Sequence, residues 1–141
     1  MTGLAPSIAG ILDTSVVVSL CALRDPASLP DEPLISAVTL AELSLGPLAA
    51  VDDLERARRQ ARLAETEANF SPLPFDAAAA RAFGRVAASM RATGRKPAAR
   101  GFDALIAATA LARGMPVYTA NARDFEGIDG LTVVSVIVDR A

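Results

Sequence analysis

Short apolar segments alternate along this chain with longer helical patterns, and no tight hairpin turn joins any two of the short segments. Apolar runs at residues 8–12, 34–35, 116–119 and 131–138 are typical of strands. Strands that no hairpin joins are connected by helical crossovers, and such crossovers make neighbouring strands parallel. The order of elements therefore predicts an α/β fold, a three-layer α/β/α sandwich with a central, mainly parallel sheet.

The first two helices are predicted from capping residues that stand before apolar runs. Asp13-Thr14-Ser15 precedes an apolar helix over residues 16–23. Either Ser36 or Thr39 caps a second helix, which is expected to stop near Gly46-Pro47.

Three further helices are predicted at residues 51–69, 76–93 and 102–113. The first two are amphipathic, and the third is apolar. Gly94 and Gly114 end the last two, as is common after helix C-termini. The apolar stripe expected to bury the 51–69 helix consists of Leu54, Ala57, Ala61, Ala64 and Ala68.

A chain of 141 residues has the usual length of one domain, so residues 1–141 are expected to form a single one. Its longest apolar runs are far shorter than the roughly 20 residues of a membrane span. No basic segment precedes an apolar stretch at the N-terminus, so we expect a cytoplasmic protein with no membrane partner. The lone Cys21 is expected to be a small core residue on the 16–23 helix.

The chain contains no histidine. This excludes Ser-His-Asp and Cys-His nucleophilic sites, an imidazole general base and a zinc site that includes histidine. Chemistry in this protein must therefore come from carboxylates, hydroxyls and a bound metal ion.

Four acidic residues are expected to converge at one edge of the predicted sheet. Asp13 directly follows the first strand, and Asp124 follows the 116–119 strand. Asp103 opens the 102–113 helix, and Glu42 lies near the start of its own helix. Ligands of open parallel sheets bind outside the carboxyl ends of the strands, where these four residues belong.

Crowded carboxylates repel one another unless a cation neutralises them. Oxygen ligands without histidine or cysteine favour Mg²⁺ or Mn²⁺ over zinc. Such an ion polarises a phosphodiester and lowers the pKa of a bound water molecule, so hydroxide forms at neutral pH without histidine. The reaction class that fits is phosphodiester hydrolysis.

Each acid also has a purely structural interpretation. Asp13 is a good N-cap, and Glu42 fits a solvated helix position, although its neighbours Leu40, Ala41 and Leu43 are apolar. Asp103 suits the first turn of a helix because of the helix dipole, and Asp124 suits a polar turn. Taken singly, none of the four establishes a site.

Basic residues gather ahead of Asp103. Between residues 77 and 114 there are seven Lys and Arg against this one acid, a local charge of +6. Such a cluster suits a phosphate backbone, although a solvated surface has the same composition. The candidates for contact with a phosphate backbone are Arg91, Arg95, Lys96 and Arg100, whereas Arg56, Arg58, Arg59 and Arg62 are expected to form a stripe that faces solvent or a protein partner.

The ordered set of motifs resembles the PIN-domain ribonucleases, and in particular the VapC-type toxins of bacterial toxin–antitoxin pairs. The resemblance spans nearly the whole chain. The matching segments are Leu12-Asp13-Thr14-Ser15, residues 36–43 with Gly46, residues 73–76, residues 102–110 with Gly114 and Val117, Thr119-Ala120-Asn121, and Asp124-Phe125.

The resemblance implies a PIN-like fold and an endoribonuclease that uses Mg²⁺ or Mn²⁺. Asp13 and Asp103 would be the main metal ligands, while Glu42 and Asp124 would complete the acidic pocket. Thr14 or Ser15 would support Asp13 by hydrogen bonding. Many PIN sequences have an aspartate where Asn121 stands here, so either Asn121 or Asp124 completes the site.

The same resemblance implies an RNA substrate, a small VapB-type antitoxin that covers the site with a basic side chain, and a homodimer. The alternative is a catalytically degenerate PIN-like module that binds RNA or protein. Dehalogenase-like phosphatases require an aspartate where Ser15 stands, and receiver domains require a late lysine, yet the only lysine is Lys96. Neither rival pattern is met.

Overall fold

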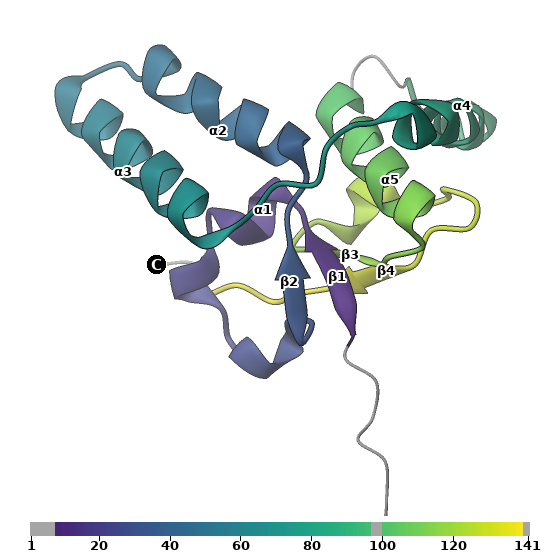
Figure 1. Cartoon of the computed structure of the whole chain (residues 1–141), viewed down its shortest axis with the longest axis horizontal. Coiled ribbons are helices and arrows are strands. Elements are labelled where there is room, and N and C mark those ends of the chain that lie inside the picture. Colours follow the sequence, from purple (N-terminus) through teal and green to yellow (C-terminus); the bar gives the residue numbers. More distant parts are fainter. Residues whose placement is uncertain (1–7, 97–99, 140–141) are drawn as a thin grey trace, which may run out of the picture.

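The computed structural model describes residues 8–96 and 100–139. Its centre is a four-stranded sheet in the order β2-β1-β3-β4, in which all neighbouring strands are parallel (Figure 1). This confirms the predicted α/β/α class with a parallel sheet. The strands are β1 (Ala9–Leu12), β2 (Glu32–Leu34), β3 (Val117–Thr119) and β4 (Val133–Ser135).

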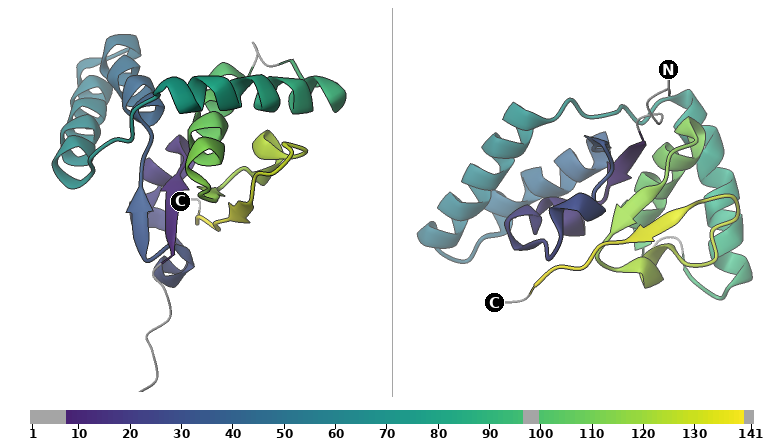
Figure 2. Two further views of the ribbon diagram at one scale, coloured as in Figure 1. Left: turned by 45° about the vertical axis from the view of Figure 1, so that its right-hand side comes forward. Right: turned by 90° about the horizontal axis from the view of Figure 1, so that it is seen from below.

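Helices cover the sheet on both faces, and the two further views in Figure 2 separate the α2–α3 pair from the α4–α5 pair. Within each pair the two helices pack against each other. The α-helices are α1 (Thr14–Val17), α2 (Ala37–Ala49), α3 (Asp53–Asn69), α4 (Ala77–Ala92) and α5 (Gly101–Arg113), and the 3₁₀ turns are η1 (Leu20–Ala22), η2 (Pro26–Ser28) and η4 (Ala122–Phe125).

The alternation of side chains along the strands divides the core into two layers. Ile11 and Val117 pack with α4 and α5 on one face of the sheet. Leu12 and Tyr118, the next residue of each strand, pack with α1 and with residues of α2 and α3 on the other face. The central strands β1 and β3 are therefore buried on both sides, as is usual for parallel sheets.

Gly10 permits the close packing of β1 against the aromatic ring of Tyr118. A Cβ atom at this position would lie 2.8 Å from Cδ1 of Tyr118 and nearer still to Cε1. A side chain at residue 10 would therefore push apart two neighbouring strands.

The helix expected over residues 16–23 is much shorter than predicted. α1 ends at Val17, and η1 follows as a separate turn. Successive β-branched valines disfavour a long helix, and Leu23 must be extended because it bridges Val138. The prediction that Cys21 is buried is wrong, because η1 directs Leu20 into the core and leaves the thiol exposed.

The second helix begins where predicted but does not stop at Gly46-Pro47. The Ser36 hydroxyl accepts a hydrogen bond from Val38 N at 2.9 Å and is the N-cap. α2 then continues to Ala49 with Pro47 buried in its last turn. Arg59 of α3 donates to the carbonyl of Gly46 at 2.9 Å, so a neighbouring helix satisfies one of the carbonyls in the last turn of α2.

The apolar stripe predicted to bury α3 faces outward. Leu54 is 64% exposed, and the four alanines of the stripe are exposed too. The helix is held instead through Leu63 and Phe70, which pack on the second core layer, and through Arg59, whose stem lies over Gly46. Alanines bury little area, so larger side chains on the opposite side decided the orientation.

The remaining elements agree with the sequence except for two strands. β2 spans Glu32–Leu34 instead of the predicted 34–35, because Glu32 and Pro33 pair with Ala9 and Gly10 of β1. Gly94 and Gly114 follow α4 and α5 with φ of 81° and 65°, as C-terminal glycines should. β4 spans only Val133–Ser135 of the predicted 131–138 segment. No helix in the described ranges is long and apolar enough to cross a bilayer. The single domain over residues 1–141 stays a prediction.

Candidate active site

The acidic residues meet where the strand order reverses. The chain passes from β1 to β2 on one side and places β3 on the other, so a crevice opens at the carboxyl ends of β1 and β3. A cavity of about 220 Å³ occupies this position. Its lining comprises Asp13, Thr14, Ser15, Val18, Glu42, Asp103, Asn121 and Asp124.

Asp13 is the most firmly held of the four acids and is only 3% exposed. Ser15 Oγ donates to its Oδ1 at 2.6 Å, and Thr119 Oγ1 donates to its Oδ2 at 2.6 Å. Its Oδ1 also accepts from Val16 N at 3.1 Å, which makes Asp13 the N-cap of α1. Burial nevertheless raises the pKa of Asp13, against the effect of these hydrogen bonds.

Glu42 is held by a threonine from the opposite wall. Thr14 Oγ1 donates to Glu42 Oε1 at 2.6 Å and lies 3.0 Å from the hydroxyl of Thr39. Burial raises the pKa of Glu42, and the negative charge of Asp13 adds to the effect. Of the two residues expected to support Asp13, Ser15 does so, whereas Thr14 supports Glu42.

Asp103 stands in the first turn of α5, and its carboxylate forms no hydrogen bond within the described part of the chain. Burial raises the pKa of Asp103 to about 6, and repulsion from Asp124, Asp13 and Glu42 contributes, in that order. The three other acids are therefore close enough to act on it. Asp103 is the member of the cluster with the most to gain from a cation.

Asp124 lies in η4 and pairs with a cation of the chain itself. Arg100 Nη1 is 2.5 Å from Asp124 Oδ1, and Arg100 is the residue before α5. Asn121 lines the same cavity, so the structure brings both candidates for the fourth position to the pocket. The role of each stays a prediction.

The four basic residues proposed for RNA contact differ in their surroundings. Arg100 reaches the acidic pocket, whereas Arg91 and Lys96 are exposed and do not line it. Arg95 donates to the backbone carbonyls of Arg123 and Asp124, so it holds η4 in place. Residues 97–99, between Lys96 and Arg100, lie outside the described residues.

Two buried threonines belong to the site although the sequence did not mark them as site residues. Thr119 and Thr39 are fully buried, and their hydroxyls lie against Asp13 and Thr14 respectively. Thr119 also accepts from Asn121 N at 2.9 Å, which ties the loop after β3 to the first acid. The available signal was their position, since Thr119 ends β3 and Thr39 precedes Glu42 by one helical turn.

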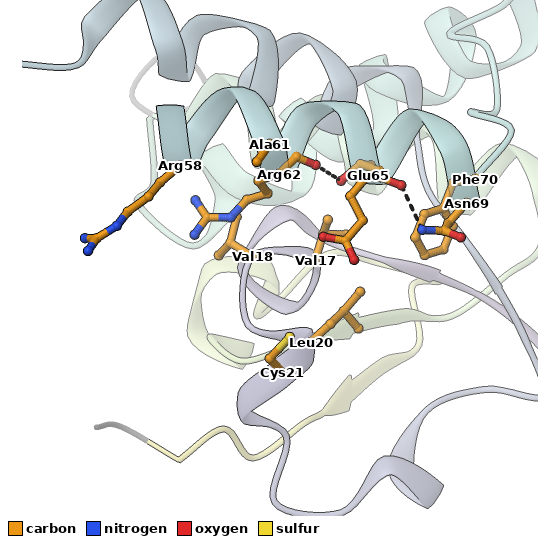
Figure 3. Close-up of a pocket in the computed structure, with 11 residues that line it drawn as sticks. Val17, Val18, Leu20, Cys21, Arg58, Ala61, Arg62, Glu65, Asn69 and Phe70 are labelled. Atoms are coloured by element: carbon orange, nitrogen blue, oxygen red, sulfur yellow. Dashed lines mark hydrogen bonds between the residues drawn. The ribbon is translucent and has the colours of Figure 1, made fainter. Parts of the chain in front are cut away.

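A second, larger cavity shares the lining residue Val18 with the acidic pocket. Figure 3 shows the side chains that line this larger cavity. Its volume is about 410 Å³, and it lies between α3 and the α1–η1 segment. Val17, Leu20 and Phe70 provide apolar surface, while Arg58, Arg62 and Glu65 extend from α3. Val18 lines both cavities, so the two lie on either side of this residue.

The pocket offers only oxygen ligands, contributed by separate elements of the fold. Burial, and after it repulsion from the other carboxylates, raises the pKa of Asp103, and a divalent cation would favour the ionised form against both effects. Within residues 8–96 and 100–139, no group of three acidic or cysteine side chains is already arranged to hold an ion. The oxygen-only donor set fits a hard cation such as Mg²⁺ or Mn²⁺. To bind the ion, the side chains would have to move closer together.

Comparison of the sequence with family models gives a match to the PIN domain over residues 11–131. The chain is 41% identical over 131 residues to Ribonuclease VapC5 of Mycobacterium tuberculosis, covering 92% of this chain and 94% of that protein. It is also 38% identical over 101 residues to Ribonuclease VapC8 of the same species, covering 72% of this chain and 89% of that protein.

Solved structures with the same fold include VapBC-5, a member of the VapBC family of toxin–antitoxin systems, and FitAcB. The crystal structure of VapBC-5 from M. tuberculosis contains a chain that matches with a TM-score of 0.78 and 38% identity, covering 93% of this chain and all of that one. FitAcB from Neisseria gonorrhoeae matches with a TM-score of 0.71 and 26% identity, covering 91% of this chain and 97% of that one.

Proposed function

This chain belongs to the PIN-domain family, and on that premise we propose that it is a metal-dependent endoribonuclease that acts as the toxin of a VapBC-type toxin–antitoxin pair. The observation that carries the proposal is the cluster of Asp13, Glu42, Asp103 and Asp124 in one cavity at the switch point of the sheet. The names of the relatives, Ribonuclease VapC5 and VapC8, support the choice of RNA as substrate.

Mg²⁺ or Mn²⁺ would be held chiefly by Asp13 and Asp103, with Glu42 and Asp124 completing the pocket. When bound, such an ion activates a water molecule and stabilises the charge that develops on the phosphate. The hydrogen bonds from Ser15 and Thr119 fix the Asp13 carboxylate before anything binds. Among the residues that the structure describes, none restrains Asp103 in this way, so its carboxylate can turn toward the ion.

The other pocket residues would position the reacting groups. Glu42, directed by Thr14, accepts a hydrogen bond from the attacking water and orients it toward phosphorus. Arg100 lies at the edge of the pocket, where its guanidinium can transfer from Asp124 to a phosphate oxygen of the RNA. Arg91 and Lys96 would then act on the RNA backbone further from the cleavage point.

The protein partner would be a small VapB-type antitoxin that enters the cavity between α3 and η1. An apolar segment fits beside Val17, Leu20 and Phe70, and Val18 lines both this cavity and the acidic pocket. A basic side chain of the same segment would then meet the carboxylates and replace the metal ion. The solved VapBC-5 complex supports this choice of partner. A homodimer is part of the same proposal.

The first test is cleavage of total cellular RNA by the purified, antitoxin-free protein with Mg²⁺ or Mn²⁺. We expect discrete fragments, which should disappear in EDTA and with Asp103→Asn. Sequencing of the new RNA ends would identify the target and the cleavage position.

Two outcomes would contradict the proposal. Absence of cleavage by metal-loaded protein across a broad set of RNAs would favour the degenerate binding module instead. Cleavage that survives both EDTA and Asp103→Asn would point to a contaminating nuclease or to chemistry without a metal ion.

A further inference from the structure

Thr39 is a fully buried polar residue that faces the acidic pocket without lining it. It precedes Glu42 by three residues in α2, so both side chains project from the same side of the helix. Both also meet the same partner, since Thr14 Oγ1 lies 3.0 Å from Thr39 Oγ1 and 2.6 Å from Glu42 Oε1. The three side chains form one chain of contacts that links α1 to α2.

The number of hydroxyl protons limits which of these contacts is the stronger hydrogen bond. The Thr14 hydroxyl has one proton and two neighbours that can accept it. An ionised carboxylate accepts more strongly than a hydroxyl, and the contact to Glu42 is the shorter of the two. The Thr14 proton therefore points chiefly to Glu42, and the Thr39 oxygen is its second, more distant acceptor, which keeps the hydroxyl aligned between the two.

We propose that Thr39 is a positioning residue for the reaction: it holds the Thr14 hydroxyl in the one orientation that directs Glu42 into the pocket. The inference rests on the proposed ribonuclease function and extends the site by a residue that touches neither metal nor substrate. Thr39 acts only through Thr14. Its hydroxyl prevents Thr14 from rotating away when Glu42 moves to meet the ion or the attacking water.

The first measurements use Thr39→Val, which keeps the shape of the side chain and removes the hydroxyl. We expect kcat for RNA cleavage to fall about tenfold, and calorimetric Mn²⁺ affinity to fall several-fold, the lower range for residues that orient metal ligands. KM for RNA should change less than about twofold, because no RNA contact is removed. Thr39→Ser should restore wild-type values.

Thr109→Val is the matched control. Thr109 is also a fully buried helical threonine, but its hydroxyl donates to the backbone carbonyl of Leu105 at 3.0 Å in α5. Removing that hydroxyl tests the general cost of a threonine-to-valine change in this core. Mn²⁺ affinity and kcat should stay at the wild-type level, and thermal unfolding should show that both valine variants are folded.

A double-mutant cycle decides whether Thr39 acts through Thr14. Thr14→Val should lower kcat and Mn²⁺ affinity by about 10- to 100-fold, as the loss of a direct partner of Glu42. If the inference is right, Thr14→Val with Thr39→Val should be no worse than Thr14→Val alone. Effects that multiply would mean that Thr39 acts independently, and would overturn the proposal.

Other results would overturn it as clearly. Wild-type Mn²⁺ affinity and kcat in Thr39→Val, or failure of Thr39→Ser to restore them, would leave Thr39 a packing residue. The calorimetric cycle stands even if no RNA is cleaved, so a failure of the ribonuclease function alone is distinguishable. A wild-type protein that binds no Mn²⁺ would remove both proposals together.

Discussion

The two halves of the acidic pocket are built in different ways. On the side of α1 and α2, Asp13 and Glu42 are held by hydroxyls at 2.6 Å. On the side of α5 and η4, Asp103 has no hydrogen-bond partner within the described residues, and Asp124 pairs with Arg100. The carboxylates on the α1 and α2 side are therefore fixed before any ion binds. The carboxylates on the α5 and η4 side are kept apart by their mutual repulsion and by the pairing of Asp124 with Arg100.

This difference suggests how the site can be stable without a metal ion and still bind one. Hydrogen bonds satisfy the buried carboxylate of Asp13, which would otherwise be costly to bury. The unsatisfied charge is concentrated at Asp103, whose pKa is raised to about 6. We call the side with Asp13 and Glu42 the rigid half of the pocket and the side with Asp103 and Asp124 the loose half. Binding energy for the ion is thus available mainly from the loose half, while the rigid half determines where the ion binds.

The largest expected effect is on the rate of RNA cleavage. Loss of a carboxylate from either half of the pocket should lower this rate to a similar extent. Asp13→Asn and Asp103→Asn each remove a ligand charge, and each should lower cleavage about 1000-fold or more, since both ligands act in the same metal-dependent step. Single-turnover cleavage of a defined RNA with Mn²⁺ would measure this. A substantial rate in either variant would mean that one half suffices for the chemistry.

Substitutions in the two halves of the pocket should change the free energy of unfolding differently. In EDTA at pH 7.5, Asp13→Ala should lower the free energy of unfolding by about 2 kcal/mol, because it removes a helix cap and leaves two hydroxyls without an acceptor. Asp103→Ala should leave it unchanged or raise it, because repulsion is relieved. Urea denaturation measures both, and equal losses would contradict the comparison.

Removing a hydrogen bond that holds Asp13 should reduce activity although every metal ligand is still present. Thr119→Val deletes the donor to Asp13 Oδ2 and should lower cleavage about tenfold, within the range for residues that orient metal ligands. Thr119→Ser should restore activity, and Thr109→Val again serves as the control for a buried hydroxyl. If Thr119→Val is fully active, Ser15 and Val16 N hold Asp13 without help.

The loose half should also set the pH dependence of stability. Asp103 has a pKa of about 6 in the folded protein against 3.8 for an ordinary aspartate, so the folded state binds more protons between these values. In EDTA, the contribution of Asp103 makes stability fall as pH rises from about 4 to about 6, by about 1 kcal/mol after allowance for solvent screening. Urea denaturation of Asp103→Asn over this range should show the contribution removed, whereas an unchanged profile would assign it elsewhere.

The smallest expected effect concerns the internal cation. Arg100→Gln removes the charge beside Asp124, so Mn²⁺ affinity should rise a few-fold while RNA binds a few-fold more weakly. The slope of RNA affinity against salt should fall by about 1 if Arg100 contacts a phosphate. Unchanged Mn²⁺ affinity would show that Asp124 does not take part in metal binding.

Much of the site was predictable because it depends on where residues stand along the chain. Asp13 and Asp124 follow strands, and parallel strands bring their carboxyl ends to one edge of a sheet. The absence of histidine limited the chemistry to carboxylates and a metal ion. The sequence left open whether Thr14 or Ser15 supports Asp13, and the fold gives this part to Ser15 and directs Thr14 to Glu42.

The sequence patterns predicted least well which side of a helix or turn faces the core. The stripe from Leu54 to Ala68 had the period of a buried helix face, yet Leu63, Thr66 and Phe70 face inward. Cys21 was expected in the core, and the break after Val17 turned it outward. In both places a few large side chains outweighed the average pattern, because they bury more apolar area than alanine or cysteine does.

The sequence by itself determined the fold class, the order of the elements and the four acids, because strand and helix periodicity and residue chemistry are local properties. Only the tertiary structure decided which hydroxyl holds which carboxylate, that Arg100 pairs with Asp124, and that Thr39 stands behind Thr14. Those contacts join residues more than twenty positions apart, and their geometry depends on how the helices pack on the sheet.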